Sequence, residues 1–269
     1  MSASKPVAVV TGASSGIGAV YAERLAARGY DLVLVARRAE RLQALSAKLA
    51  QTHRTQVETV AADLTSEAGL VRVEHILATN PDVSLLVNNA GNGKLGATVA
   101  MSAADAAATI ALNVTAPTRL TRAALPPFLA RNAGAIINVS SVMALHSLPI
   151  TSLYSGTKAF VLAFSRGIQE ELAGTGVRLQ VVLPAGVATE FYDQAGIPLS
   201  AFDPAVVMTA EDMVDAALTG FDRGEAVTLP SVHDLALWDR HDAARAALFG
   251  ATQNGKPAPR YLAEQGLAA

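Results

Sequence analysis

Short apolar runs alternate with segments of helical periodicity along most of the chain. The apolar runs occupy residues 7–11, 31–36, 57–61, 83–87, 136–139, 177–183 and 226–229. Apolar positions spaced three or four residues apart mark predicted helices at 20–28, 38–50, 70–77, 102–131, 155–173, 211–221 and 235–248. Strands that read as continuous apolar runs are buried on both faces, which is typical of a parallel sheet covered by helices. The pattern predicts an α/β fold with a doubly wound, seven-stranded parallel sheet and helices on both faces.

The domain organisation is predicted to be simple. No repeat or low-complexity linker divides the 269 residues, so we expect one domain over 1–269. Residues 190–210 lack a clear period and are expected to form a variable lid over a binding site. Residues 231–269 follow the last apolar run and are expected to form a C-terminal extension with one amphipathic helix.

Composition excludes several classes of function. Hydrophobic residues make up 51% of the chain and charged residues 16%, which excludes a disordered protein. The net charge is −2 and no basic block stands out, so we expect no nucleic-acid partner. The chain has no cysteine, which excludes disulfides, thiolate catalysis and cysteine-based zinc sites. His233 and His241 do not have metal-ligand spacing, so we expect no bound metal.

No segment predicts contact with a membrane. The first apolar run is too short for the core of a signal peptide. The longest uncharged stretch, residues 132–157, contains several amide and hydroxyl side chains and does not read as a membrane-spanning helix. We therefore expect no membrane association. The absence of cysteine is compatible with a cytoplasmic location, which is our expectation.

A glycine-rich loop connects the first apolar run to the first predicted helix. It reads Gly12-Ala-Ser14-Ser15-Gly16-Ile17-Gly18. Glycines let the backbone approach a ligand closely, and the N–H groups of a helix N-terminus attract phosphate. A plain glycine-rich turn is the alternative, but the position between a strand and a helix favours binding of a dinucleotide pyrophosphate on a Rossmann-type sheet.

The end of the second apolar run bears on coenzyme choice. An acidic residue there would accept a hydrogen bond from the ribose of NAD, but this chain has Ala36, followed by Arg37 and Arg38. A guanidinium suits the 2′-phosphate of NADP through bidentate hydrogen bonds. The alternative is that both arginines belong to a solvated helix start, where positive charge opposes the helix dipole. We therefore predict NADP(H) as the cofactor.

A tyrosine and a lysine form the candidate catalytic pair. Tyr154 and Lys158 are four residues apart, so they share one face of a helix. A nearby cation favours phenolate and lowers the pKa of a tyrosine, which suits proton transfer to a developing alkoxide. Such a pair also occurs by chance, so its surroundings decide its meaning.

The surroundings sharpen this interpretation. Ser141 lies thirteen residues before Tyr154, Asn88-Asn-Ala-Gly91 closes the fourth run, and Asn113 lies inside a helical stretch. With these motifs, residues 5 to about 230 resemble the short-chain dehydrogenase/reductase family, in its shorter, single-domain branch. The resemblance implies reduction of a ketone or aldehyde to an alcohol, or the reverse, by hydride transfer from NADP(H) to a small-molecule substrate. It also implies a homotetramer or homodimer.

The resemblance also assigns roles to residues. Tyr154 would donate the proton, Ser141 would hydrogen-bond the carbonyl oxygen, and Lys158 would lower the pKa of Tyr154 and bind the nicotinamide ribose. Asn113 would hold a water that links Lys158 to solvent. The implied cofactor contacts are Gly12, Ser14, Ser15, Gly16, Ile17, Gly18, Arg37, Arg38, Asp63, Leu64, Asn89, Ala90, Gly91, Tyr154, Lys158, Pro184, Gly186, Val187 and Thr189.

One loop departs from the family pattern. After the sixth run the family reads Pro-Gly-x-Val-x-Thr, whereas this chain has Ala185 between Pro184 and Gly186. We expect Gly186 to supply the missing backbone freedom one residue later. Met143, Leu145, Phe191 and Tyr192 flank the expected substrate cleft and favour an apolar or aromatic carbonyl compound.

Two other functions compete with this one. A non-catalytic NADP-binding sensor could use the same fold, since fold does not determine function. The presence of Ser141, Tyr154 and Lys158 together argues against it. An enoyl reductase would have its lysine seven residues after the tyrosine, where this chain has Val161.

Overall fold

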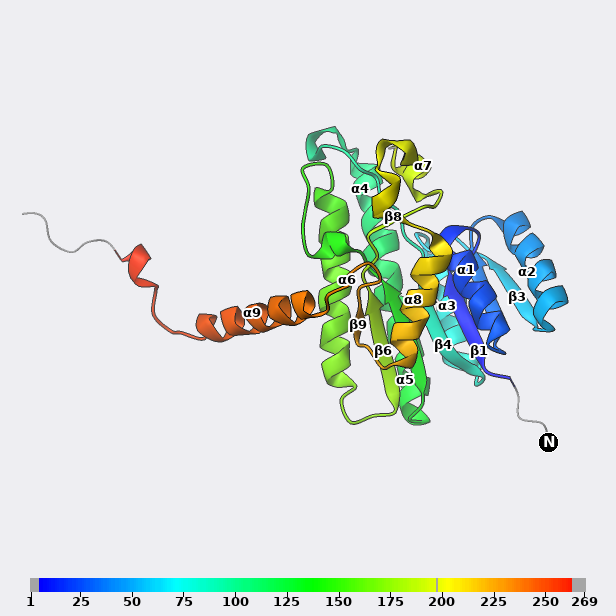
Figure 1. The fold of residues 1–269 in the computed structure, drawn as a ribbon. Helices are drawn as coiled ribbons and strands as arrows, with labels where there is room; N and C mark the ends of the chain where they lie inside the picture. Colours follow the sequence, from blue (N-terminus) through cyan, green and yellow to red (C-terminus); the bar gives the residue numbers. More distant parts are fainter. Residues whose placement is uncertain (1–4, 197, 263–269) are drawn as a thin grey trace, which may run out of the picture. The chain divides into compact units, whose positions relative to one another are not determined.

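The computed structural model describes residues 5–196 and 198–262, and the chain divides into two units, 1–231 and 232–269. A seven-stranded sheet, in which neighbouring strands run parallel, forms the centre of the first unit (Figure 1). Its strands are β1 (Val7–Thr11), β2 (Asp31–Ala36), β3 (Val57–Ala61), β4 (Val83–Asn88), β5 (Gly134–Val139), β6 (Val177–Val182) and β9 (Val227–Thr228). Each lies on one of the seven predicted runs, so the predicted fold class is confirmed, with ends that differ by at most two residues.

Helices cover both faces of this sheet. They are α1 (Gly16–Ala27), α2 (Ala39–His53), α3 (Glu67–Thr79), α4 (Ala103–Ile110), α5 (Ala116–Ala130), α6 (Ser152–Glu171) and α8 (Ala210–Asp222). One buried cluster joins the sheet to α1, α2 and α8, and contains Tyr21, Leu42 and Met213. The other joins it to α3, α5 and α6, and contains Leu70, Phe128 and Ile168. Burial on both faces explains why the strands read as continuous apolar runs.

The strand order creates the binding crevice. The order is β3-β2-β1-β4-β5-β6-β9, so the chain builds outward in one direction from β1 and then restarts on the other side at β4. The loops that follow β1 and β4 therefore leave the sheet in opposite directions. In sheets of this kind, ligands bind at the carboxyl ends of the strands where the order reverses.

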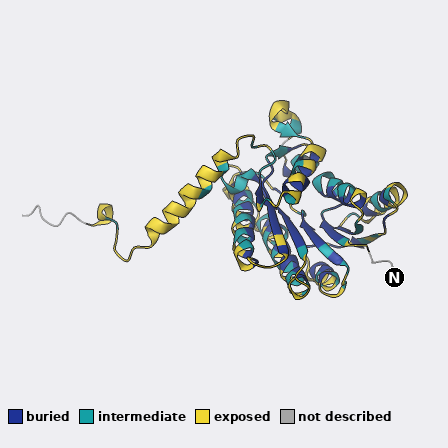
Figure 2. Cartoon of the chain, turned by 60° about the horizontal axis from the view of Figure 1, so that its bottom comes forward, coloured by how far each residue is buried: buried dark blue, intermediate teal, exposed yellow. Residues whose placement is uncertain are grey.

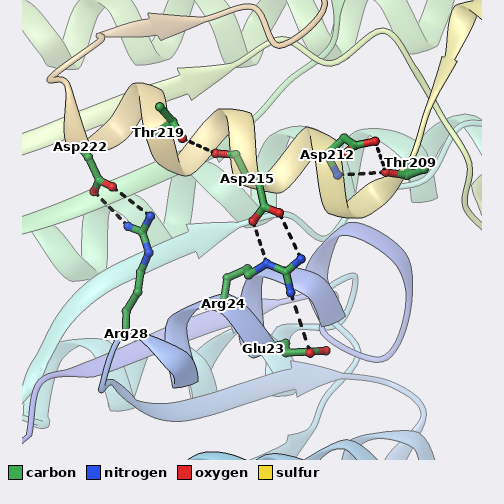
Figure 3. Close-up of polar contacts among 8 residues, drawn as sticks. All are labelled: Glu23, Arg24, Arg28, Thr209, Asp212, Asp215, Thr219 and Asp222. Atoms are coloured by element: carbon green, nitrogen blue, oxygen red, sulfur yellow. Dashed lines mark hydrogen bonds and ion pairs between the residues drawn. The ribbon is translucent and has the colours of Figure 1, made fainter.

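Two bidentate ion pairs connect α1 to α8 (Figure 3). The Arg24 guanidinium donates to both carboxylate oxygens of Asp215, at 2.7 and 3.1 Å. Arg28 donates to both oxygens of Asp222, at 3.0 and 2.9 Å. Exposed pairs contribute on the order of 0.2–1 kcal/mol each, so the buried contacts between these helices supply most of the stability. The pairs link α8 to α1, the helix that begins at the glycine loop, and to Arg28, which directly follows it.

The helix predicted over 102–131 is interrupted. After α4 comes one turn of π-helix, η2 (Ala111–Thr115), in which the Ala116 N–H donates to the carbonyl oxygen of Ala111, five residues earlier. The regular helix α5 then resumes. Single π-helical turns inside α-helices occur often at functional sites. This turn carries Asn113, one of the predicted catalytic residues.

Short elements fill the predicted lid. A separate two-stranded parallel sheet pairs β7 (Gly186–Val187) with β8 (Val207–Met208). Between them lie the short helix α7 (Phe191–Ala195) and the 3-10 turns η4 (Leu199–Ala201) and η5 (Pro204–Val206). The described residues of the expected lid, 190–196 and 198–210, are therefore structured.

The second unit contains α9 (Ala236–Thr252) and the 3-10 turn η6 (Pro259–Tyr261). The helix predicted at 235–248 is present, but α9 buries none of its residues, and Figure 2 shows it exposed along its length. Its apolar side chains are spread around the helix, so the predicted amphipathic face is not formed. Among residues 5–196 and 198–262, no helix has the length and apolar content that crossing a bilayer requires.

Candidate active site

Backbone geometry explains the glycines of the loop after β1. Gly12 and Gly16 have φ of +70° and +53°, in the left-handed region that favours glycine. A Cβ on Gly18 would lie 2.4 Å from the carbonyl oxygen of Gly12, which leaves no room for a side chain. The loop leads directly into the N-terminus of α1 at Gly16. These residues fit a dinucleotide, because the loop presents its backbone and a helix N-terminus to the crevice.

Thr11 and Asn89 hold the loops after β1 and β4 together. The Thr11 hydroxyl oxygen accepts hydrogen bonds from the backbone N–H groups of Asn89 and Ala90, both at 3.0 Å. The Asn89 side-chain amide donates to the Thr11 carbonyl oxygen at 2.9 Å. Asn88 instead points into the protein and donates to Asn138 at 2.9 Å, which ties β4 to β5. The Asn88–Gly91 motif therefore supports both the sheet and the crevice.

A cavity of about 370 Å³ lies at this edge of the sheet. It brings together most of the predicted site residues. These are Gly12, Ser15, Gly16, Ile17, Asn89, Ala90, Gly91, Ser141, Tyr154, Lys158, Pro184, Gly186, Val187 and Thr189. The predicted residues that are not among its lining are Ser14, Gly18, Arg37, Arg38, Asp63, Leu64 and Asn113. Within the described part of the chain, no group of three or more His, Asp or Glu side chains could hold a metal ion.

Two adjacent serines at the end of β5 have different surroundings. The Ser141 hydroxyl donates to the Pro184 carbonyl oxygen at 3.3 Å and accepts from the Met143 N–H at 3.1 Å. Ser141 also hydrogen-bonds the phenol of Tyr154, which acts to lower the pKa of that tyrosine. Ser140 is buried and donates to the Lys158 carbonyl oxygen at 2.8 Å. Ser141 therefore faces the candidate catalytic tyrosine, and Ser140 holds α6 to the sheet.

Burial dominates the electrostatics of the Tyr154–Lys158 pair. Burial raises the pKa of Tyr154 to about 12, with a smaller upward contribution from Tyr192. Burial lowers the pKa of Lys158 to about 8. The Lys158 ammonium donates to the Val139 carbonyl oxygen at 3.0 Å and lies 5.7 Å from the centre of the Tyr154 ring. The net effect on the pKa of Tyr154 is thus upward, not the lowering expected from Lys158.

Asn113 holds two elements together. Its side-chain oxygen accepts from the Asn92 N–H at 2.9 Å, and its amide donates to the Asn92 carbonyl oxygen at 2.8 Å and to the Thr157 hydroxyl at 3.1 Å. The side chain is therefore used to attach the loop after β4 to α6. Pro117 lacks an N–H and cannot donate to the Asn113 carbonyl, four residues earlier. That Asn113 holds a water stays a prediction.

The structure distinguishes the two arginines after β2. The Arg38 guanidinium donates to the Ser14 hydroxyl at 3.1 and 3.0 Å and to the Ser15 hydroxyl at 2.6 Å, so it lies on the glycine loop. Arg37 is exposed. A backbone hydrogen bond from Thr65 is the main cause that lowers the pKa of Asp63, and the charge of Arg37 adds a smaller part. Arg38 is the better placed of the two to bind a phosphate.

Two charged residues near Arg38 were missed by the sequence analysis. Glu190 accepts from Arg38 at 2.8 Å and from Arg41 at 2.6 Å. Arg41 lies three residues after Arg38, so the shared helix face was a signal that could have identified it. Glu190 directly follows the predicted cofactor residue Thr189, but its partners are about 150 positions away in the chain, and no local pattern reveals that contact.

Aromatic and aliphatic side chains form the other wall of the cavity. The Phe191 ring lies 5.5 Å from the Tyr154 ring, and Tyr192 lies 4.9 Å from Phe202, measured between ring centres. Met143 lines the cavity as expected, whereas Leu145 is not among its lining residues. Further apolar lining comes from Leu95, Val142, Leu148, Ile150, Val206 and Val207.

Gly186 has a different role from the one expected. It lies in β7 and is not among the glycines with positive φ, so it does not supply unusual backbone freedom. A Cβ at this position would lie 3.2 Å from the Tyr192 hydroxyl oxygen and 3.2 Å from the Val206 carbonyl oxygen. The expectation was therefore wrong, and Gly186 is small because the lid packs closely against it.

Comparison with known proteins agrees with this geometry. The sequence pattern of the short chain dehydrogenases matches residues 6–197. The chain belongs to the short chain dehydrogenase family. The description of this family names dehydrogenases.

Solved structures match almost the whole chain. A short-chain dehydrogenase from Sphingobium yanoikuyae in complex with NADPH is 45% identical, with a TM-score of 0.92 over 95% of this chain and 100% of its own. The bulky-bulky ketone specific alcohol dehydrogenase from Comamonas testosteroni is 40% identical, with a TM-score of 0.87 over 96% and 98%.

A curated relative matches over a shorter span. The very-long-chain 3-oxoacyl-CoA reductase-A of Danio rerio is 37% identical over 187 residues, which is 68% of this chain and 58% of that protein. The match thus covers less than two thirds of the relative.

Proposed function

We propose that this protein is an NADP(H)-dependent dehydrogenase that interconverts a bulky, apolar ketone and its secondary alcohol. One observation carries the proposal. Ser141, Tyr154 and Lys158 provide polar groups in a cavity whose remaining wall is largely apolar and aromatic, beside the glycine loop. Pockets of this kind orient an apolar ligand through a few polar groups.

The coenzyme follows from the charges around the glycine loop. Ala36 has no acceptor for a ribose hydroxyl, whereas Arg38 lies on Ser14 and Ser15. A guanidinium next to two hydroxyl groups is a suitable donor set for a 2′-phosphate. The Sphingobium yanoikuyae relative, whose structure contains NADPH, supports this choice.

The protein's own groups then account for the proton. When bound, the nicotinamide coenzyme supplies or accepts the hydride. A Tyr154 phenol with a pKa of about 12 is protonated at neutral pH, so it can donate its proton to a carbonyl oxygen. The Ser141 hydroxyl can turn its single proton from the Pro184 carbonyl to the substrate carbonyl oxygen and donate a hydrogen bond there. Reduction is therefore the direction that the resting protonation state favours, and oxidation is favoured by high pH.

Substrate size follows from the lid and the relatives. Apolar residues of the segment after β5 and of the lid, among them Ile150, Phe202 and Val206, line the cavity. The names of two relatives, a bulky-bulky ketone specific alcohol dehydrogenase and a very-long-chain 3-oxoacyl-CoA reductase, both describe large carbonyl compounds. We therefore favour ketones with large groups on the carbonyl over small ketones.

A paired kinetic screen tests the function. Oxidation of NADPH would be followed by absorbance with a small dialkyl ketone and with an aryl ketone that has a large group on each side of the carbonyl. We expect turnover that favours the larger ketone and exceeds the rate with NADH. A Tyr154→Phe variant is the control for background oxidation. Equal rates for wild type and this variant would favour the alternative, a non-catalytic NADP-binding sensor.

A further inference from the structure

A carboxylate occupies the edge of the site where the coenzyme phosphate would bind. Glu190 lines the cavity and accepts from Arg38 at 2.8 Å and from Arg41 at 2.6 Å. Arg38 is the same residue that lies on Ser14 and Ser15 of the glycine loop. Glu190 thus uses two of the guanidinium groups that would attract a 2′-phosphate.

A phosphate and this carboxylate are both anions, so they repel each other and compete for the same guanidinium groups. Arg38 directs Nε and Nη2 to the serines and Nη1 to Glu190, so a phosphate that binds Arg38 must share its donors with the carboxylate or displace it. Glu190 and both arginines are between 38% and 49% exposed, so solvent weakens these pairs and makes exchange of partners feasible.

The same segment reaches the catalytic tyrosine. Phe191, next to Glu190, has its ring 5.5 Å from the Tyr154 ring, and it fills the space above Gly93, where an added Cβ would lie 2.2 Å from the ring. Tyr192 follows, with its hydroxyl oxygen close to Gly186. Three consecutive side chains therefore extend from the arginines of α2 to the substrate side of the cavity.

We infer that Glu190 is a coenzyme-selectivity residue that competes with the 2′-phosphate for Arg38 and Arg41, and that its displacement releases residues 190–192 from the glycine loop. The inference rests on the proposed NADP(H) dependence. Binding couplings are reciprocal, so a phosphate that displaces Glu190 loosens the lid, and a free lid strengthens phosphate binding. The Glu190 carboxylate thus reduces the preference for NADP(H) over NAD(H). It also couples binding of the coenzyme to the access of a substrate to Tyr154.

Two nucleotide fragments test the competition without reaching the nicotinamide position. Adenosine 2′,5′-bisphosphate carries the 2′-phosphate and 5′-AMP lacks it. Calorimetry would measure their dissociation constants for wild type, Glu190→Gln and Asp222→Asn. The last variant is the matched control, because it removes the same charge from an exposed arginine pair, Arg28–Asp222, that is not part of the cavity lining.

We expect Glu190→Gln to bind the bisphosphate about two- to thirtyfold more tightly, the range given by two exposed ion pairs of about 0.2–1 kcal/mol each. Binding of 5′-AMP should stay unchanged, and Asp222→Asn should behave as wild type. Hydrogen exchange of residues 190–196 should rise when wild type binds the bisphosphate, and should already be high in Glu190→Gln. An unchanged or weakened affinity of Glu190→Gln for the bisphosphate would overturn the competition, as would exchange that does not respond.

The outcomes separate this inference from the proposed function. If wild type prefers the bisphosphate and Glu190→Gln does not alter the preference, the role of Glu190 fails and NADP(H) dependence stands. If wild type shows no preference but Glu190→Gln acquires one, competition by Glu190 is supported and the NADP(H) assignment of the wild type fails. If neither protein shows a preference, both fail.

Discussion

Lys158 is expected to destabilise the folded protein, and replacing it by methionine tests this. Lys158 is buried, with only 7% of its surface exposed. Its ammonium donates a hydrogen bond to one backbone carbonyl, that of Val139. No carboxylate is among the causes of its pKa shift, which is attributed to burial. A buried cation without a counter-ion costs free energy that an apolar side chain of similar length does not.

The pKa shift sets the size of this cost. Burial lowers the pKa of Lys158 from 10.5 to about 8, which corresponds to roughly 3 kcal/mol of free energy of unfolding below pH 8. Loss of the hydrogen bond to Val139 offsets about 1 kcal/mol of the gain. We therefore expect Lys158→Met to be more stable than wild type by about 2 kcal/mol at pH 7. For a chain of this size that raises Tm by roughly 4–8 °C.

The pH dependence identifies the cause. Below pH 8 the lysine is charged in both the folded and the unfolded protein, so the full penalty is present. Between pH 8 and 10.5 the unfolded chain binds the proton and the folded protein does not, so wild type gains stability as the pH rises. Above 10.5 the penalty is gone, and the advantage of the variant is lost.

Thermal and denaturant unfolding of coenzyme-free protein between pH 6.5 and 10.5 would measure this difference. The control is Lys48→Met, which removes an exposed lysine that pairs with Glu23 and should not stabilise the protein. The Lys158→Met variant should also lose turnover, so the same substitution should raise the stability of the protein and lower its activity. A free energy difference between Lys158→Met and wild type that is constant from pH 7 to 10.5 would refute the reasoning.

The remaining predictions concern the site. Tyr154→Phe should keep NADPH binding and lose turnover by roughly 10²–10⁴, as measured by coenzyme titration and steady-state kinetics; near wild-type turnover would exclude Tyr154 as the proton donor. Ser141→Ala should lower kcat by about 10²–10³, whereas Ser140→Ala, which removes the hydrogen bond to α6, should mainly lower Tm. A larger loss of kcat in Ser140→Ala than in Ser141→Ala would mean that the roles of the two side chains are wrongly assigned. Arg38→Ala should raise KM for NADPH by about ten- to a hundredfold and leave KM for NADH nearly unchanged, and Arg37→Ala should have the smaller effect; equal effects on both coenzymes would refute a role in binding the 2′-phosphate.

The fold could be predicted because each of its main contacts has a local signature. Strands buried between two helical layers read as apolar runs, and the glycines after β1 mark a turn that a side chain would block. The reversal of strand order at β4 then brings separate motifs to one edge of the sheet. Ser141, Tyr154 and Lys158 meet because β5 leads to this edge and α6 runs past it.

Other features depend on contacts that no local pattern contains. The contact of Arg38, and not of Arg37, with Ser14 and Ser15 depends on the tertiary structure, which sequence spacing does not report. The pairing of Glu190 joins residues about 150 positions apart. The pKa of Tyr154 is a balance in which burial outweighs the hydrogen bond from Ser141, and sequence spacing does not report burial.

The π-helical turn at Ala111–Thr115 amounts to one residue more than a regular α-helix would need between α4 and α5. Such a turn absorbs an inserted residue, so the helices on either side keep the faces that they would have in an uninterrupted helix. A chain with one residue fewer here could still pack α5 against the sheet, but Asn113 would lose its position between Asn92 and Thr157. The one additional residue of the π-helical turn is therefore needed for the position of Asn113 in the site, and not for the packing of α5 against the sheet.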